Sequence, residues 1–187
     1  MKTALYFGSF NPMHLGHITI CRYLLEKTEI DQLRLVVSPG NPLKSAENFK
    51  NARQRLICAQ NIIKEEFPNY NIVVSDIEFQ LVPPLYTINT IRYLKESEPG
   101  NQFILVIGSD NLAIIEKWHK WQELLSETEI WVYPEKVAMP GSYATNTAAA
   151  CWMHLSLTSP QLKSGNREAG YQSDLLTKKS QRESLGG

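Results

Sequence analysis

Two histidines three residues apart follow a short apolar run that ends at a glycine. The run spans residues 3–7, Gly8 follows it, and His14 and His17 come just before a stretch with helical periodicity. A glycine lets the backbone approach a phosphate closely, and the N-terminus of a helix offers unpaired N–H groups to an anion. The spacing therefore predicts an anion-binding turn in which both imidazoles reach one phosphate group.

A histidine pair at this spacing is also typical of structural and metal-binding sites. A zinc site needs further ligands nearby, and none is evident in this part of the sequence. The pair follows a strand, a glycine turn and Pro12, and imidazoles placed there can stabilise the charge that grows on a phosphate during transfer. The position therefore favours phosphate chemistry.

Alternating strands and helices are expected to hold this turn in place. The strand-like runs are residues 3–7, 33–38, 71–77, 102–107 and 129–133. The helical patterns are residues 17–27, 52–66, 87–96 and 111–125. This alternation predicts an α/β fold with a doubly wound, mainly parallel sheet of the Rossmann-like type. Ligands bind such sheets beyond the carboxyl ends of the strands, where Gly8, Pro39 and Gly108 fall.

Composition restricts the partners of the chain. With 187 residues it can bury one sizeable core, and its formal net charge is zero. No overall charge draws it to nucleic acid or to an anionic membrane surface, so we expect neither as a partner. No apolar run reaches the roughly 18–20 residues that span a bilayer, and the first residues lack the apolar stretch of a signal peptide. We predict a cytoplasmic protein and leave a homo-oligomer open.

The first turn carries a highly specific motif. Residues 8–17, GSFNPMHLGH, resemble the GxFxPxHxGH signature of the HxGH nucleotidylyltransferase superfamily. Its members transfer a nucleoside monophosphate from ATP or CTP to a phosphate nucleophile, release pyrophosphate and use Mg²⁺. The resemblance implies catalysis by His14 and His17, with Mg²⁺ arriving on ATP and no metal ligand from protein side chains. The nucleotide contacts that it implies in this turn are Gly8, Ser9, Phe10 and Gly16.

Two later segments resemble one branch of the superfamily, the nicotinate mononucleotide adenylyltransferases. Residues 38–44, SPGNPLK, are similar to its SPxNPxK loop, which implies that Lys44 meets phosphate in acceptor binding and catalysis. Residues 85–90, LYTINT, resemble its YTxxT element, which implies that Thr87 lies beside the pyridine ring. Two alternatives stay open: Lys44 as a solvated loop charge, and Thr87 as a helix cap.

A third turn is similar to the GxDxxxxxxxW pattern of the same branch. Gly108 permits close approach of the nucleotide, and Asp110 is expected to accept hydrogen bonds from ribose hydroxyls. Trp118 is expected to offer a flat face to the nicotinate ring. Because Trp118 and Trp121 are three residues apart, a helix core explains their spacing equally well.

The pattern changes after residue 134, where the resemblance ends. Residues 135–187 are rich in Ser, Thr, Ala, Gly and Gln, and only short pieces such as residues 151–157, CWMHLSL, could pair with a sheet. The ISSTxIR element that supplies the family's triphosphate ligands has no counterpart here. We therefore predict a nucleotidylyltransferase domain at residues 1–134. The atypical segment at residues 135–187 is then frame-shifted, poorly ordered, or a partly ordered extension laid on the sheet.

Together the motifs predict transfer of AMP from ATP to nicotinate mononucleotide, giving nicotinate adenine dinucleotide and pyrophosphate in NAD biosynthesis. Positioning and charge neutralisation by His14, His17, Lys44, the helix N-terminus and Mg²⁺ are expected to carry the catalysis. One alternative is another adenylyl- or cytidylyltransferase of the superfamily, such as a phosphopantetheine adenylyltransferase. Another is a nucleotide-binding protein with little activity, because the ISSTxIR element is missing. A redox Rossmann protein is disfavoured, because no GxGxxG follows the first strand.

Overall fold

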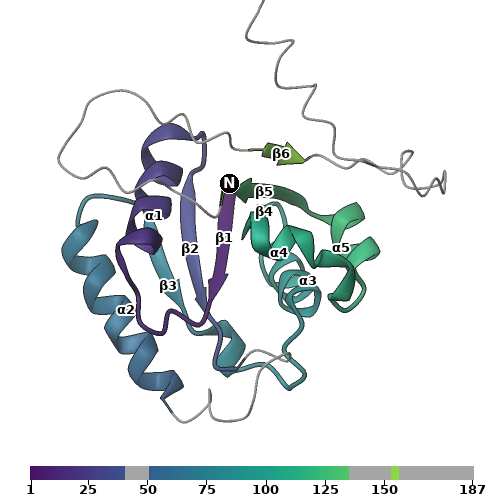
Figure 1. Cartoon of the computed structure of the whole chain (residues 1–187), viewed down its shortest axis with the longest axis horizontal. Helices are drawn as coiled ribbons and strands as arrows, with labels where there is room; N and C mark the ends of the chain where they lie inside the picture. Colours follow the sequence, from purple (N-terminus) through teal and green to yellow (C-terminus); the bar gives the residue numbers. More distant parts are fainter. Residues whose placement is uncertain (41–50, 135–152, 156–187) are drawn as a thin grey trace, which may run out of the picture. The chain divides into compact units, whose positions relative to one another are not determined.

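The computed structural model describes residues 1–40 and 51–134 and the backbone of residues 153–155. Within these residues the strands form one sheet in the order β3-β2-β1-β4-β5-β6 (Figure 1). The strands are β1 (Lys2–Gly8), β2 (Gln32–Val37), β3 (Ile72–Ser75), β4 (Gln102–Gly108), β5 (Glu129–Tyr133) and β6 (Met153–Leu155). The first five are parallel and β6 is antiparallel to β5, so the predicted α/β fold with a mainly parallel sheet is confirmed.

Helices cover both faces of this sheet, as a doubly wound fold requires (Figure 1). The helical elements are α1 (Leu15–Lys27), α2 (Ala52–Glu66), η2 (Ile77–Phe79), α3 (Thr87–Ser97), α4 (Ser109–Ala113), η3 (Ile115–Lys117) and α5 (Trp121–Glu127). Tyr6 packs with α1 and α2, and its neighbour Leu5 packs with α3 and α5, because successive strand residues point to opposite faces. No helix in the described part of the chain is long and apolar enough to cross a membrane.

The winding direction reverses between β1 and β4. From β1 the chain moves outward to β2 and β3, and it then returns to the other side of β1 with β4 and β5. In the parallel register Tyr6 lies opposite Val106 and Gly8 lies opposite Val37. The carboxyl ends of β1, β2 and β4 therefore share one edge, at the switch point where doubly wound sheets bind their ligands.

The helix predicted over residues 111–125 is wrong, because the chain is broken there into α4, η3 and α5. Trp118 has extended backbone and Lys120 is left-handed, with φ 53°. No glycine or proline marks this break in the sequence. Trp118 packs against the core, and the ring of His119 stacks on Tyr86, so tertiary contacts outweigh helix propensity at this point.

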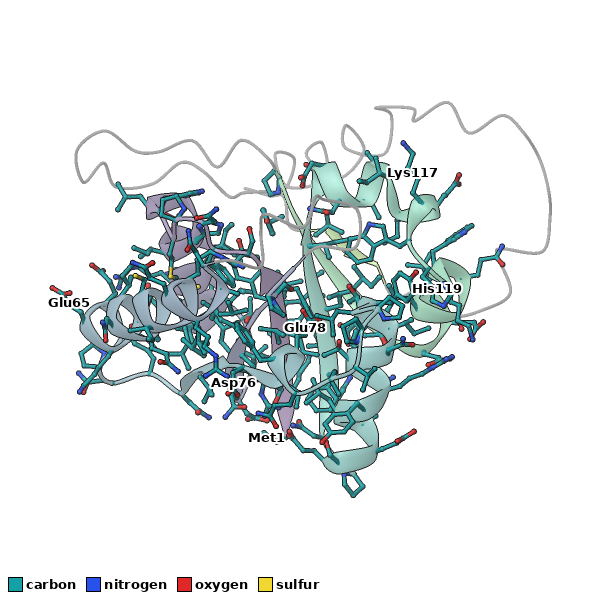
Figure 2. All side chains as sticks on the ribbon, turned by 90° about the horizontal axis from the view of Figure 1, so that it is seen from below. Met1, Glu65, Asp76, Glu78, Lys117 and His119 are labelled. Atoms are coloured by element: carbon teal, nitrogen blue, oxygen red, sulfur yellow. The ribbon has the colours of Figure 1, made fainter. Side chains whose placement is uncertain are left out.

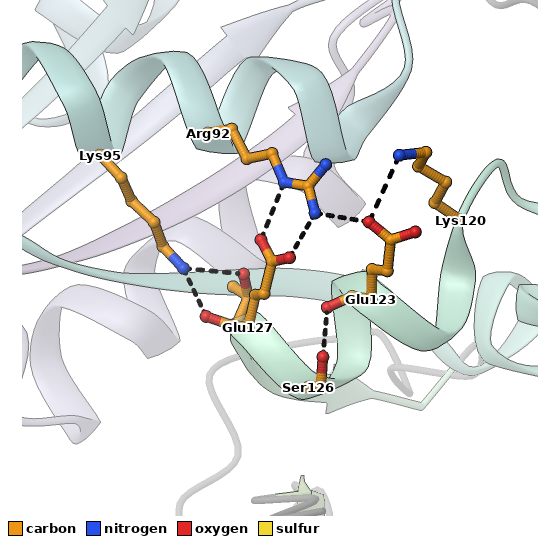
Figure 3. Close-up of polar contacts among 7 residues, drawn as sticks. Arg92, Lys95, Lys120, Glu123, Ser126 and Glu127 are labelled. Carbon is orange, nitrogen blue, oxygen red and sulfur yellow. Dashed lines mark hydrogen bonds and ion pairs between the residues drawn. The ribbon is translucent and has the colours of Figure 1, made fainter.

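Ion pairs join α3 to α5 at the surface (Figure 3). Arg92 of α3 donates from Nε to Glu127 at 2.9 Å and from Nη2 to Glu123 at 2.6 Å. Lys95 donates to the backbone oxygen of Glu127, and Lys120 lies 3.4 Å from Glu123. All these side chains are partly exposed, so each pair adds little stability, and together they tie the two helices side by side.

A short piece of the C-terminal segment completes the sheet. The backbone of β6 pairs with β5, with His154 opposite Trp131. This strand lies inside residues 151–157, the piece that the sequence predicts could pair with a sheet. The rest of residues 135–187 lies outside the described residues, and the predicted domain boundary at residue 134 stays a prediction.

Candidate active site

Phe10 shapes the first turn by folding its ring over Gly8. It has a φ of 44° and is 2% exposed, and its ring centroid lies 5.6 Å from that of Tyr6 and 5.1 Å from that of His17. A Cβ built on Gly8 would lie 3.0 Å from the tip of this ring, so the ring explains why residue 8 is glycine. Phe10 thus supports His17 from the core, and direct nucleotide contacts by Gly8 and Phe10 stay predictions.

His14 and His17 form a reciprocal cap at the N-terminus of α1. The Nδ1 atom of His14 accepts a hydrogen bond from the backbone N–H of Gly16 at 3.1 Å. The Nδ1 atom of His17 accepts one from the backbone N–H of His14 at 3.2 Å, and the two ring centroids are 3.9 Å apart. A Cβ on Gly16 would lie 3.0 Å from the ring of His14. The predicted pairing of the two imidazoles in the first turn of a helix is confirmed.

These hydrogen bonds determine which ring nitrogen carries the proton. A nitrogen that accepts a hydrogen bond has no proton of its own, so the neutral rings of His14 and His17 both carry the proton on Nε2. Burial, and to a smaller extent the neighbouring His14, lowers the pKa of His17 to about 4. His17 is therefore neutral at pH 7, and its Nε2–H is available to donate to an oxyanion.

A buried arginine joins the first turn to the second. Arg53 and Arg55 lie near the start of α2, and the structure places Arg53 at the surface. Arg55 is buried, and its guanidinium donates to the carbonyl oxygens of Ser9, Ser38 at 3.1 Å and Pro39 at 3.0 Å. Arg55 thus holds the backbone of both turns.

The predicted acceptor residues lie on separate parts of the chain. Lys44 is outside the described residues, so its role stays a prediction. Thr87 is the first residue of α3, whose N-cap is Tyr86, so the alternative in which Thr87 caps the helix is wrong. Trp118 follows η3, is partly buried and packs against the core beneath α3 and α5. Contacts of Thr87 and Trp118 with a pyridine ring stay predictions.

A ring stack, which the sequence does not predict, joins the segment at Thr87 to the segment at Trp118. Tyr86 and His119 stack with centroids 4.1 Å apart and ring planes 18° from parallel. Tyr86 directly precedes Thr87, and His119, which is labelled in Figure 2, directly follows Trp118 in the sequence. The stack therefore fixes the start of α3 against the break before α5. No local pattern predicts it, because the partners are far apart in the sequence.

Gly108 ends β4 and leaves room for Asp110. A Cβ built on Gly108 would lie 2.3 Å from Oδ1 of Asp110 and 3.2 Å from the ring of Tyr133. The Asp110 side chain is exposed and accepts a hydrogen bond from Nδ2 of Asn111 at 3.1 Å. An exposed carboxylate at this edge of the sheet suits the hydroxyls of a ribose, and this contact stays a prediction.

The donor set of the first turn suits oxyanions. It consists of imidazole N–H and backbone N–H groups at a helix N-terminus. Among residues 1–40 and 51–134, no group of three or more His, Cys, Asp or Glu side chains is placed to hold a metal ion. Magnesium bound to a triphosphate takes most of its ligands from phosphate oxygens and water. The donor set of this turn thus suits the oxyanions of a nucleotide, and Mg²⁺ as a companion of ATP stays a prediction.

Comparisons with known proteins identify the family of the chain. The model of the cytidylyltransferase-like family matches residues 5–173. Two bacterial proteins named as probable nicotinate-nucleotide adenylyltransferases align over 134 residues, which is 72% of this chain and 68% of each relative. The protein from Flavobacterium psychrophilum is 41% identical, and that from Flavobacterium johnsoniae is 40% identical.

Solved structures share the fold. A protein from Vibrio parahaemolyticus assigned to the nicotinate-nucleotide adenylyltransferases superposes with a TM-score of 0.60 at 26% identity, covering 74% of this chain and 80% of that one. A Plasmodium falciparum nicotinic acid mononucleotide adenylyltransferase solved with NaAD superposes with a TM-score of 0.60 at 20% identity, covering 78% and 67%, and this likeness shows the fold alone. Fold and site together define an enzyme of the nucleotidyltransferase class. The chain belongs to the cytidylyltransferase-like family and, within it, to the nicotinate-nucleotide adenylyltransferases.

Proposed function

We propose that the chain transfers the adenylyl group of ATP to nicotinate mononucleotide, in the cytoplasm and as a step of NAD biosynthesis. An oxygen of the acceptor's 5′-phosphate attacks the α-phosphorus of ATP, and the bond from that phosphorus to the bridging oxygen of pyrophosphate breaks. The products are nicotinate adenine dinucleotide and pyrophosphate. No covalent enzyme intermediate is needed, because the acceptor itself carries the nucleophile.

The reciprocal cap formed by His14 and His17 is the observation that carries this proposal. It directs two Nε2–H donors from the N-terminus of α1, beyond the carboxyl end of β1. Such donors stabilise the negative charge that develops as the α-phosphoryl group is transferred. A neutral His17 suits this role, because its proton is kept for a hydrogen bond through the reaction.

The acceptor assignment is supported by the names of the relatives and by the segment around α3 and α5. Thr87 and Trp118 are the sequence neighbours of Tyr86 and His119, whose rings stack on one another. We assign the pyridine ring to this side of the site and the acceptor phosphate to Lys44. The names of the relatives from Flavobacterium support nicotinate mononucleotide over other phosphate acceptors.

Magnesium belongs to the proposal as a companion of ATP. When bound, it offsets the negative charge of the triphosphate and of the pyrophosphate that leaves. The residues of this chain orient the α-phosphoryl group through His14 and His17, and Asp110 is proposed to hold the ribose.

A second candidate function is nucleotide binding without useful turnover. It is favoured by one observation, the absence of an ISSTxIR element from the sequence. A site that lacks those triphosphate ligands would still bind nucleotide through the first turn, but it would stabilise the transferring group less.

Pyrophosphate release decides between these functions. The enzyme is supplied with ATP and Mg²⁺ and, in turn, with nicotinate mononucleotide, nicotinamide mononucleotide or phosphopantetheine. We expect release with nicotinate mononucleotide and loss of it in His17→Ala. The matched control is Thr28→Ala, which removes a hydrogen bond at the opposite end of α1 and is expected to keep wild-type activity. Retained ATP binding without release for any acceptor would establish the second candidate.

A further inference from the structure

Two buried charged side chains meet at the turn that follows β2. Within the described residues, Arg55 and Glu78 are the charged side chains that are buried, at 6% and 3% exposed. Arg55 donates to the carbonyl oxygens of Ser38 and Pro39, and the carboxylate of Glu78 accepts a hydrogen bond from the hydroxyl of Ser38. Burying a carboxylate is costly unless it is well hydrogen-bonded, so these hydrogen bonds are what allow Glu78 to be buried.

Glu78 also bonds to α3. Its Oε1 atom accepts a hydrogen bond from Oγ1 of Thr90 at 3.0 Å, and Thr90 is completely buried. Burial raises the pKa of Glu78, and the hydrogen bonds from Ser38 and Thr90 oppose that rise. Glu78 itself lies in η2, between β3 and α3. One carboxylate thus connects the end of β2 to the first turns of α3.

This connection leads directly to the acceptor side of the site. Thr90 lies one helical turn after Thr87, on the same face of α3, so the anchored Thr90 sets the rotation of the turn that carries Thr87. The backbone oxygen of Tyr86 accepts hydrogen bonds from Asn89 and Thr90, and the Tyr86 ring stacks on His119. A shift of α3 would therefore move Thr87. It would also move Tyr86, whose ring stacks on His119, the residue that follows Trp118.

We propose that Glu78 is a positioning residue for the acceptor: by holding Ser38 and Thr90 together, it aligns the turn after β2 with the start of α3. Neither hydroxyl is proposed to touch the substrate. The inference rests on the proposed function, because it takes nicotinate mononucleotide as the molecule that binds between these two segments.

Thr90→Val is the sharpest test, and Thr3→Val is its matched control. Both threonines are completely buried, and both donate a hydrogen bond to a side chain, to Glu78 and to Asn101 respectively. Thr3 lies near the start of β1, at the amino ends of the strands, whereas the site lies at their carboxyl ends. In Thr90→Val we expect the KM for nicotinate mononucleotide to rise about tenfold while the KM for ATP changes less than about twofold. Thr3→Val is expected to leave both KM values unchanged.

Substitutions of Glu78 itself separate hydrogen bonding from charge. Glu78→Gln keeps an oxygen that accepts from Thr90 and gains an N–H that donates to the hydroxyl of Ser38. It should therefore keep the acceptor KM within about threefold of wild type, whereas Glu78→Leu, which loses both bonds, should resemble or exceed Thr90→Val. Hydrogen exchange provides a second readout, in which the amides of the first turn of α3 exchange faster in Thr90→Val than in Thr3→Val.

The outcomes distinguish the inference from the function on which it rests. An active wild type whose Thr90→Val and Thr3→Val variants share its acceptor KM would overturn the inference and leave the function intact. Equal rises of the acceptor and ATP KM values would overturn it too, because they indicate general loosening. A wild type inactive with nicotinate mononucleotide would overturn the proposed function, and the hydrogen-exchange comparison would then decide whether Glu78 holds α3.

Discussion

We propose that the site has a nucleotide half and an acceptor half, which are assembled over very different distances along the chain. The nucleotide half lies within residues 8–17, where each Nδ1 of the histidine pair bonds to a backbone N–H two or three residues away. The acceptor half depends on contacts between remote segments, such as the bond from Thr90 to Glu78 and the stack of Tyr86 on His119. The nucleotide half can be recognised from its sequence motif, because its contacts are local. The acceptor half depends on how the helices pack on the sheet, because its contacts join segments that are far apart in the sequence.

This difference implies that the two halves can be damaged separately. Substitutions in residues 8–17 should lower kcat, because we propose that these residues stabilise charge on the group that is transferred. Substitutions among the contacts of α3 should raise the acceptor KM, because they move the binding surface of the acceptor. The predictions below test that separation.

Loss of the His17 imidazole should have the largest effect. We expect His17→Ala to lower kcat about 10²–10³-fold, because one oxyanion donor is lost, with little change in the acceptor KM. Initial rates of pyrophosphate release at varied acceptor concentration measure both constants. A decrease in kcat of less than about threefold would show that this imidazole does not stabilise the transition state.

A methyl group at position 16 should disturb the same half less severely. The Cβ of Gly16→Ala would lie 3.0 Å from the ring of His14, so that ring must shift, while alanine favours the helix itself. We expect kcat to fall about tenfold with no loss of thermal stability. Parallel rate measurements and thermal melts check this, and an unchanged kcat would show that the position of the His14 ring does not limit the rate.

The free energy of unfolding should depend on pH through His17, which lies in the nucleotide half. The pKa of His17 is lowered from its ordinary value near 6.5 to about 4, mainly by burial, so the unfolded chain binds this proton more readily than the folded one. The stabilisation from a neutral His17 is complete above about pH 6.5 and is lost as the pH falls towards 4. Urea unfolding across this range should show a steeper loss for the wild type than for His17→Ala, and parallel curves would contradict the assignment.

The ion pairs between α3 and α5 should matter least. Arg92 and its partners Glu123 and Glu127 are partly exposed, where water and salt screen their charges (Figure 3). We expect Arg92→Ala to change the acceptor KM by less than about twofold, because the buried Thr90 and the stacked Tyr86 still hold α3. A rise in the acceptor KM as large as that in Thr90→Val would show that the surface ion pairs of Arg92, rather than Glu78, position α3.

The same contrast explains what could be predicted from the sequence. The bounds of α2 and β5 match the predicted residues 52–66 and 129–133, because strong apolar periodicity is a local property. The pairing of His14 and His17 follows in the same way from their spacing at a helix start.

The remaining features depend on tertiary structure. The break at Trp118 carries no glycine or proline signal, and it exists because side chains there pack against the sheet and against Tyr86. In the sequence nothing distinguishes Glu78 from a surface glutamate, because its hydrogen-bond partners Ser38 and Thr90 come from other elements. Whether Thr87 and Trp118 meet the acceptor, and how Lys44 acts, stay predictions.

The central claim is that both imidazoles of the first turn accept a hydrogen bond at Nδ1 and donate from Nε2, and that His17 is neutral at pH 7. Nitrogen NMR of the histidine side chains, titrated from pH 8 to pH 4, tests it most directly. The account predicts that His17 keeps its Nε2–H tautomer down to about pH 5 and titrates only near pH 4. A His17 that titrates near 6.5, or that carries its neutral proton on Nδ1, would contradict the account.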